Sequence, residues 1–140
     1  MQAVGSDRSL VAVNLVVLFH WVATWTVSRL VPSEFVKPIL DSMHQGMFVF
    51  LNDSGLDQNT SQCFVHERYA EYRDALSTRK GGEVLHHWAA CFVGFCNPKD
   101  DGQVFYSLDF RKITPVALHI GAFASAFPKA LVQLIKIHAA

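Results

Sequence analysis

Four side chains in the middle of the chain have the types and spacing of metal ligands. Cys63 and His66 stand three residues apart, which places them on one face of a helix. His87 and Cys91, four residues apart, share a helical face in the same way. Together they would supply the two thiolates and two imidazoles that tetrahedral Zn²⁺ accepts. An antiparallel hairpin that turns near residue 80 does not bring His66 opposite His87, however, so we predict no metal site.

The same hairpin favours a disulfide instead. It brings Cys63 opposite Cys96, and these two residues can be bridged if their Cα atoms come within about 7 Å. An oxidised pair would indicate an oxidising compartment, such as the secretory lumen or the mitochondrial intermembrane space. The alternative is that Cys63, Cys91 and Cys96 are three buried and inert thiols.

Two further histidines lie inside long apolar runs. Imidazoles paired across two membrane-spanning helices can bind haem, which makes His20 and His119 candidate ligands. The alternative is that each ring bonds to a neighbouring helix or lies near a membrane surface. We predict that the protein binds no haem and no other cofactor.

No signature of catalysis is complete in this chain. His66 and Glu67 match the opening of the HExxH pattern of zinc proteases, but Ala70 stands where the second histidine is required. The sequence contains no GxGxxG, GK[ST] or GxSxG motif. The pair Gly81–Gly82 is typical of a helix stop rather than of a phosphate-binding loop. The sequence therefore predicts a protein that is not an enzyme.

The elements that position these side chains belong to an apolar chain. Its 140 residues are 51% hydrophobic and only 17% charged, whereas a typical soluble domain is about 25% charged. The length suits one domain, and the apolar content excludes intrinsic disorder. The 12 basic residues balance the 12 acidic residues, and the only basic doublets are Arg79–Lys80 and Arg111–Lys112. Nucleic acid is therefore not an expected partner, because phosphate contacts need clustered Lys and Arg.

Residues 10–28 are the best candidate for a transmembrane helix. The first 18 of them carry no formal charge, and as a helix they approach the roughly 30 Å hydrocarbon thickness of a bilayer. Trp21 and Trp25 lie near the end of the run, where an interfacial aromatic belt is expected, whereas Asn14 and His20 weaken the prediction. The alternatives are a buried core helix, a β-rich core segment and a secretory signal peptide.

Residues 34–51 predict an amphipathic helix, for which Ser33 is a suitable cap. Its apolar side chains recur every three or four residues and form one stripe, consisting of Phe35, Ile39, Met43, Met47 and Phe50. The polar segment 52–62 then predicts a loop. It contains glycosylation sequons at Asn52 and Asn59, which would be used only if this loop faced a secretory lumen.

Residues 63–96 predict a helical hairpin. Its first helix has an apolar stripe that includes Tyr69 and Tyr72, and its charged residues, Arg68 among them, are expected on the other faces. Gly81–Gly82 ends this helix, because glycine tolerates the left-handed conformation that follows a helix end. The second helix is largely apolar but too short to cross a membrane.

Residues 113–135 predict an apolar helix and a candidate second membrane segment. Small residues recur at every fourth position and form a face that another helix can approach closely, consisting of Ala117, Gly121 and Ser125. Pro128 interrupts the run, so a kinked or half-buried helix and a clean span remain alternatives. Before this helix, residues 103–110 could form a short strand or an extended segment.

These elements predict a mainly α, small membrane-associated helical protein in a single domain, residues 1–140. It would have one N-terminal transmembrane helix, a middle helical hairpin and a candidate C-terminal membrane helix. If both apolar segments cross the membrane, residues 29–112 form one loop and both termini lie on the opposite side from it. Basic residues flank the first segment almost equally, so the positive-inside rule does not set its orientation.

The functional expectation is a non-catalytic accessory or structural subunit of a multi-subunit membrane protein complex. The apolar segments, the amphipathic helices that cannot bury themselves alone and the missing catalytic signature support it. We expect the mitochondrial inner membrane, with a complex of the respiratory-chain or ATP-synthase type, and other subunits and lipid as partners. Two alternatives remain: a secreted or viral-type membrane glycoprotein, and a soluble helical binding domain with all three apolar runs in one core.

Overall fold

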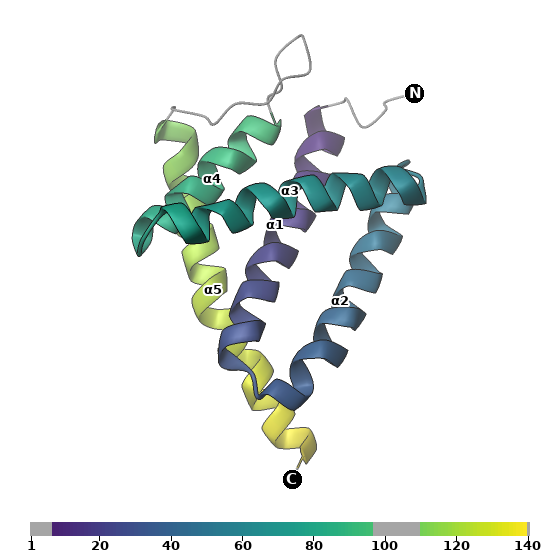
Figure 1. The fold of residues 1–140 in the computed structure, drawn as a ribbon, viewed down its shortest axis with the longest axis vertical. Helices are drawn as coiled ribbons and strands as arrows, with labels where there is room; N and C mark the ends of the chain where they lie inside the picture. The colour runs from purple at the N-terminus through teal and green to yellow at the C-terminus, as the bar shows by residue number, and fades with distance from the viewer. Residues whose placement is uncertain (1–6, 97–109, 140) are drawn as a thin grey trace.

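The computed structural model describes residues 7–96 and 110–139, and their regular structure is entirely helical (Figure 1). The five helices are α1 (Asp7–Leu30), α2 (Ser33–Asp53), α3 (Gln58–Thr78), α4 (Gly82–Cys96) and α5 (Phe110–Ala139). No strand occurs among these residues, which confirms the mainly α class. Most of the segment predicted to be extended, residues 103–109, lies outside the described residues, and Phe110 begins α5.

Helix α1 is the central element of the molecule and contacts each of the other four helices. Its side chains Val13, Val17, Leu18, Val22 and Val27 are completely buried. Apolar residues lie on every side of α1 rather than on one stripe, and a helix of this kind is stable only where neighbours surround it.

The core has two parts, one on each side of α1. The larger part lies between α1, α3, α4 and α5, and Tyr72, Trp88 and Ile120 are fully buried there. The smaller part lies between α1, α2 and α3 and includes Met47 and Leu51. The indole Nε1 of Trp88 donates a 2.7 Å hydrogen bond to the carbonyl oxygen of Tyr72, which fixes α4 against α3.

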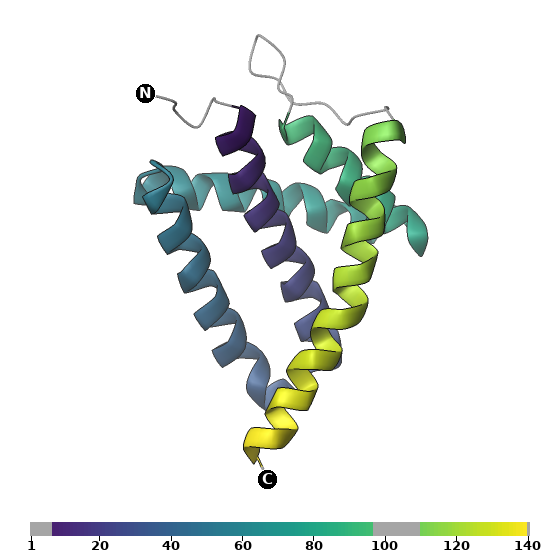
Figure 2. The same ribbon diagram turned by 180° about the vertical axis from the view of Figure 1, so that it is seen from behind.

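Helices α1 and α5 run side by side in the same direction, while α2 runs back beside α1 (Figures 1 and 2). The beginning of α1 and the end of α5 therefore lie at opposite ends of the molecule (Figure 1). The expected topology, with both termini on one side of a membrane, requires the two apolar helices to run in opposite directions, whereas α1 and α5 run in the same direction. The physical reason is that α2 returns the chain along α1, so residues 29–112 do not stay at one end of it.

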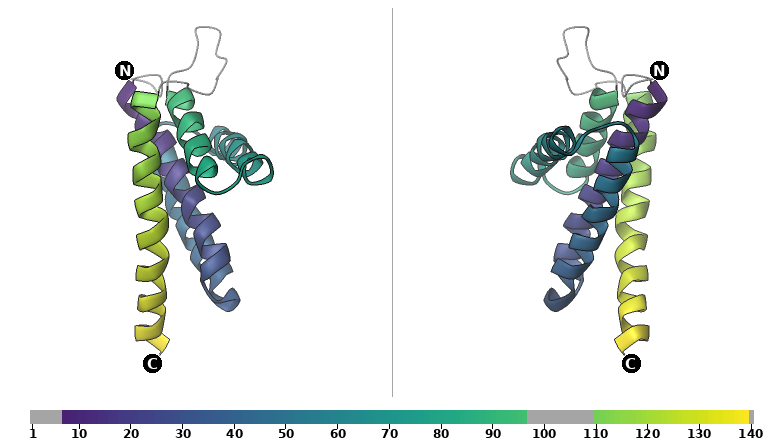
Figure 3. Two further views of the ribbon diagram at one scale, coloured as in Figure 1. Left: turned by 90° about the vertical axis from the view of Figure 1, so that its left-hand side faces the viewer. Right: turned by 90° about the vertical axis from the view of Figure 1, so that its right-hand side faces the viewer.

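Helix α3 lies across the other helices rather than along them, and in Figure 3 it is seen nearly end-on. It packs on α1, α2 and α4, whereas no contact joins α3 to α5 among the described residues. Its inward side is narrow and contains Ser61, Val65, Tyr72 and Ala75. The remaining sides of α3 are mostly polar and exposed, so the molecule has one apolar side at α5 and one polar side at α3.

The predicted loop at residues 52–62 is wrong over most of its length. Asp57 caps α3, because its Oδ1 accepts a 2.8 Å hydrogen bond from the backbone N–H of Thr60, and α3 therefore begins at Gln58. Asn52 lies in the last turn of α2 and Asn59 in the first turn of α3, so both sequons stand at helix ends.

The amphipathic helix predicted at residues 34–51 corresponds to α2, although its buried stripe differs in detail. Met47 is buried as predicted, but Leu51 is buried in place of Phe50, which is 38% exposed. Ser33 is the first helical residue rather than the cap, and Pro32 precedes it without a side-chain capping bond.

The hairpin predicted at residues 63–96 has its turn in the expected place but not its expected packing. Gly81 adopts a left-handed φ of 57°, which lets the chain reverse between α3 and α4. The two helices cross steeply instead of lying antiparallel (Figure 3). The pairing of residues across an antiparallel hairpin therefore does not apply to them.

Candidate functional site

The predicted disulfide between Cys63 and Cys96 is absent from the structure, in which all three cysteines are free. Cys63 is exposed on α3 and Cys96 is half-buried at the end of α4. The end of α4 faces Arg68 and Tyr72 instead, since the Arg68 guanidinium lies 4.2 Å from the ring centre of Phe95. This shifts the register by more than one helical turn from the one that the sequence predicted.

The two inner thiols are poorly suited to chemistry. Burial raises the pKa of the Cys96 thiol to about 11, although the nearby Arg68 opposes this effect. Burial raises the pKa of Cys91 further still, and the acidic side chains of Glu71 and Asp74 add to the increase. Because the thiolate is the reactive form, neither residue is an effective nucleophile near neutral pH.

The four metal-ligand candidates are not brought together. Cys63 and His66 are exposed on α3, whereas His87 and Cys91 are buried on α4. Within residues 7–96 and 110–139, no three His, Cys, Asp or Glu side chains are grouped so that they could hold a metal ion. Burial lowers the pKa of His87, and the positive charge of Arg79 lowers it further.

The two candidate haem ligands lie in different surroundings. His119 is exposed on α5, whereas His20 is half-buried on α1 and faces α2. The neighbour of His20 is His44, and their ring centres are 6.3 Å apart. The histidine pair formed by the fold is therefore His20 with His44, which the sequence analysis did not identify.

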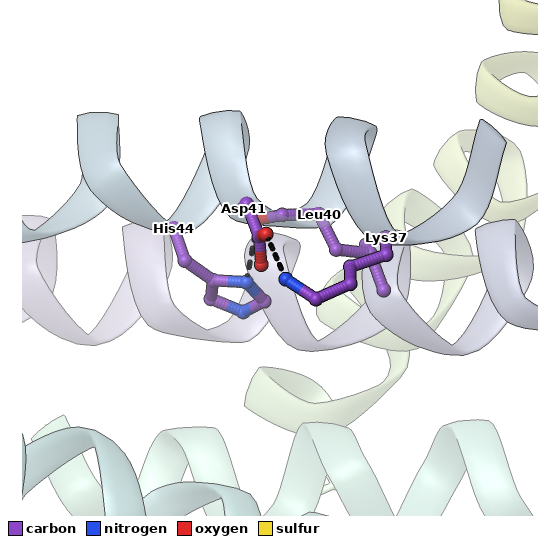
Figure 4. Close-up of polar contacts among 4 residues, drawn as sticks. All are labelled: Lys37, Leu40, Asp41 and His44. Atoms are coloured by element: carbon purple, nitrogen blue, oxygen red, sulfur yellow. Dashed lines mark hydrogen bonds and ion pairs between the residues drawn. The ribbon is translucent and has the colours of Figure 1, made fainter.

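His44 is the centre of a polar cluster that joins three helices. Its Nδ1 lies 2.8 Å from the carbonyl oxygen of Leu40, as Figure 4 shows, and must carry the proton because a carbonyl only accepts. Its Nε2 is therefore the acceptor, and the hydroxyl of Tyr69 on α3 donates to it over 2.8 Å. Thr24 Oγ1 on α1 lies 3.4 Å from the same nitrogen.

Burial also affects the phenol of this cluster. It raises the pKa of Tyr69 on α3 well above its usual value, so the phenol keeps the proton that it donates to His44 Nε2. The imidazole and the phenol can thus hold α1, α2 and α3 together through hydrogen bonds.

A second polar junction joins α1 to α3 through Arg68. The sequence analysis expected this side chain on an outer face, but it is only 12% exposed. Its Nε donates a 3.1 Å hydrogen bond to Oδ1 of Asn14, and its guanidinium lies between the rings of Phe64 and Phe95, 4.1 and 4.2 Å from their centres. Glu67, 3.8 Å away, is largely exposed. The polar residue Asn14 thus has its partner inside the molecule.

The small-residue face of α5 packs partly against the chain's own α4. Ala117 is buried, and Gly121 is half-buried with Leu85 of α4 next to it. A Cβ atom on Gly121 would lie 3.6 Å from Cδ1 of Leu85. Ser125, the third member of the face, is exposed. The close helix packing that this face was predicted to allow therefore occurs within the chain, between α5 and α4, at Ala117 and Gly121.

The largest uncovered apolar feature is the outer side of α5. An exposed stripe follows this helix at steps of three or four residues and consists of Leu118, Ala122, Ala126, Ala130, Leu134 and Ile137. Both Ser9–Leu30 of α1 and Arg111–Ile137 of α5 are long and apolar enough to cross a membrane. They differ in burial: of the most apolar 18 residues of each segment, half are buried inside the molecule in α1 and only 11% in α5.

Comparison of the chain with protein-family models, with curated proteins and with solved structures found no match.

Proposed function

We propose that this protein is a non-catalytic accessory subunit of a multi-subunit membrane protein complex. The observation that carries the proposal is the uncovered apolar stripe of α5. Between the basic residues Lys112 and Lys129, α5 extends over about 26 Å, close to the roughly 30 Å of hydrocarbon in a bilayer, and this part contains the stripe residues Leu118, Ala122 and Ala126. A soluble protein rarely leaves a continuous apolar face of this kind in water, so lipid or an apolar partner helix is its expected cover.

The polar side of the molecule supports a complex rather than a chain surrounded by lipid. Helix α3 crosses α1 beside Asn14 and Trp21, within the candidate span, and presents polar side chains outward. Polar groups facing lipid at that depth are costly. We therefore propose that α5 faces lipid while α2 and α3 face other subunits of the complex.

The charges of α2 are compatible with a position beside α1 inside the membrane part of the complex. Its charged residues Lys37 and Asp41 form an ion pair with each other on the outer side of the helix (Figure 4). Pairing reduces the cost of placing two charges away from bulk water, and intramembrane charges in proteins are commonly paired. The assignment to the mitochondrial inner membrane, with a respiratory-chain or ATP-synthase type of complex, rests on the sequence expectation alone.

Carbonate extraction of native membranes, followed by native electrophoresis of a detergent extract, tests the proposal. We expect the protein in the membrane pellet and in an assembly much larger than a single chain. The variant Ala122→Arg/Ala126→Arg should lower the fraction retained in the pellet, because arginine stays charged at the alkaline pH of the extraction and places two charges in the stripe. The matched variant Thr78→Arg/His86→Arg adds the same charges at exposed positions near the turn between α3 and α4 and should stay in the pellet.

Two outcomes would contradict the proposal and support the alternatives. Release of the unmodified protein as a single chain would favour a soluble helical domain, an alternative that the half-buried α1 also fits. A mobility shift after glycosidase treatment would favour a membrane glycoprotein with a modified Asn52 or Asn59.

A further inference from the structure

A groove lies where the end of α1 meets the second half of α5. It has a volume of about 500 Å³. Its apolar lining is formed by Leu30 of α1 and by Ala124, Pro128 and Val132 of α5. Pro128 has no N–H to donate to the carbonyl oxygen of Ala124, so this part of the groove also contains a backbone acceptor without its usual helical donor.

The polar lining of the same groove is basic. Lys129 and Lys136 line it, seven residues apart on one face of α5, together with the uncharged side chains Ser125 and Gln133. No acidic residue lines the groove, and neither lysine has an ion-pair partner among the residues that the structure describes. Arg29 precedes Leu30 in the last turn of α1, but it does not line the groove, and its guanidinium lies 4.3 Å from the ring centre of Trp25.

The groove therefore combines an apolar floor with a cationic rim at the end of the candidate span Ser9–Leu30. A bilayer changes from hydrocarbon to headgroups at such a position, and an anionic phospholipid has the matching chemistry. Its phosphate suits the two lysines, and its acyl chain suits the surface formed by Leu30 and Val132. A free anion would make no use of the apolar floor, and a neutral lipid would make no use of the lysines.

We propose that the groove between α1 and α5 is a binding site for one anionic phospholipid. The phosphate contacts Lys129 and Lys136, and the first part of an acyl chain lies along Leu30, Pro128 and Val132. This inference rests on the proposed function, since it needs the molecule to be in contact with a bilayer.

The full-length chain, purified in a mild detergent and mixed with equal amounts of dioleoyl phosphatidylglycerol and dioleoyl phosphatidylcholine, tests the site by native mass spectrometry. We expect retention of one phosphatidylglycerol with a preference of about tenfold or more over phosphatidylcholine, because each lysine near a charged headgroup contributes. The variant Lys129→Gln/Lys136→Gln should lose this preference. Its matched control Lys80→Gln/Lys112→Gln, which alters two exposed lysines elsewhere, should keep it.

Two further measurements separate a lipid site from a simple anion site. Leu30→Gln leaves both lysines in place, and because Leu30 is 54% exposed the change should not disturb folding. It should lower phosphatidylglycerol retention severalfold, while an excess of inorganic phosphate should displace little of the lipid. Equal retention of both lipids, or full displacement by phosphate, would overturn the inference.

The proposed function and this inference can fail separately. Carbonate release of the unmodified chain would remove the membrane assignment and the lipid site with it. Carbonate retention without a preference for phosphatidylglycerol would remove the lipid site alone. A thermal melt of each variant in detergent shows whether a lost preference reflects unfolding.

Discussion

At the residue scale, the polar side chains of α1 have partners inside the chain. Asn14 bonds to Arg68, Thr24 contacts His44, and the hydroxyl of Thr26 donates to the carbonyl oxygen of Ala23 over 3.1 Å. His20 Nδ1 donates in the same local way to the carbonyl oxygen of Val16. Asn14 and Thr24 therefore join α1 to other helices, whereas Thr26 and His20 bond within α1. These hydrogen bonds lower the cost of burying polar groups, although the buried indole Nε1 of Trp21 has no hydrogen-bond partner among the described residues.

The hydrogen bond between Tyr69 and His44 should contribute to stability. The variant Tyr69→Phe removes the hydroxyl that donates to His44 Nε2 and should lower the unfolding free energy by about 1–3 kcal/mol, because it leaves a half-buried acceptor without its donor. Chemical denaturation in detergent measures the change.

The control His119→Gln alters an exposed side chain on α5 and should leave the stability unchanged. Equal stability of Tyr69→Phe and the unmodified protein would show that this hydrogen bond does not hold the helices together.

At the scale of the elements, the structure separates two helices that the sequence presents as similar. Both α1 and α5 pass the length and hydropathy criteria for a membrane span. The neighbours of α1 bury about half of its most apolar 18 residues, although Val11, Leu15 and Leu30 stay exposed. Among the described residues, α5 contacts α1 and α4 alone and keeps its outer stripe uncovered. The length and composition of a helix therefore indicate lipid contact less well than the extent to which neighbouring helices bury it.

The contact between α4 and α5 leaves room for only a small side chain at Gly121. Replacement by alanine places a Cβ atom 3.6 Å from Leu85 Cδ1, an ordinary van der Waals distance, and should be tolerated or slightly stabilising. Replacement by leucine should destabilise the protein by about 1–3 kcal/mol, because the longer side chain overpacks this contact. Thermal or chemical unfolding of both variants in detergent measures the difference. Equal stability of Gly121→Leu and the unmodified protein would show that this face is not in close contact.

At the scale of the whole molecule, the chain passes along its long axis three times. Helices α1 and α5 run one way, and α2 runs the other way on the opposite side of α1 from α5 (Figures 1 and 2). If the long axis follows the membrane normal, as the two candidate spans suggest, the start of α1 and the end of α5 face different compartments. The transverse α3 then lies on the side of α1 that faces away from α5 (Figure 3).

Epitope tags at the two termini test this topology. We expect a tag at the N-terminus and a tag at the C-terminus to be cleaved by protease from opposite sides of sealed membrane vesicles. A double-tagged chain in permeabilised vesicles, in which both tags should be cleaved, is the control. Cleavage of both tags from the same side would contradict the three-pass arrangement and restore the topology expected from the sequence.

The sequence by itself determined that this chain is helical and where most of its helices lie, because periodicity, capping residues and glycine stops act over a few neighbouring residues. The bounds differ from the predicted ones at several ends: α3 begins at Gln58 because Asp57 caps it, and α5 extends from Phe110 to Ala139 rather than over residues 113–135. The tertiary structure decided the rest: the crossing of α3 and α4 that separates Cys63 from Cys96, the burial of Arg68, and the parallel course of α1 and α5. These features depend on which faces of distant helices pack together, and the free energy of that packing is not encoded within any one helix.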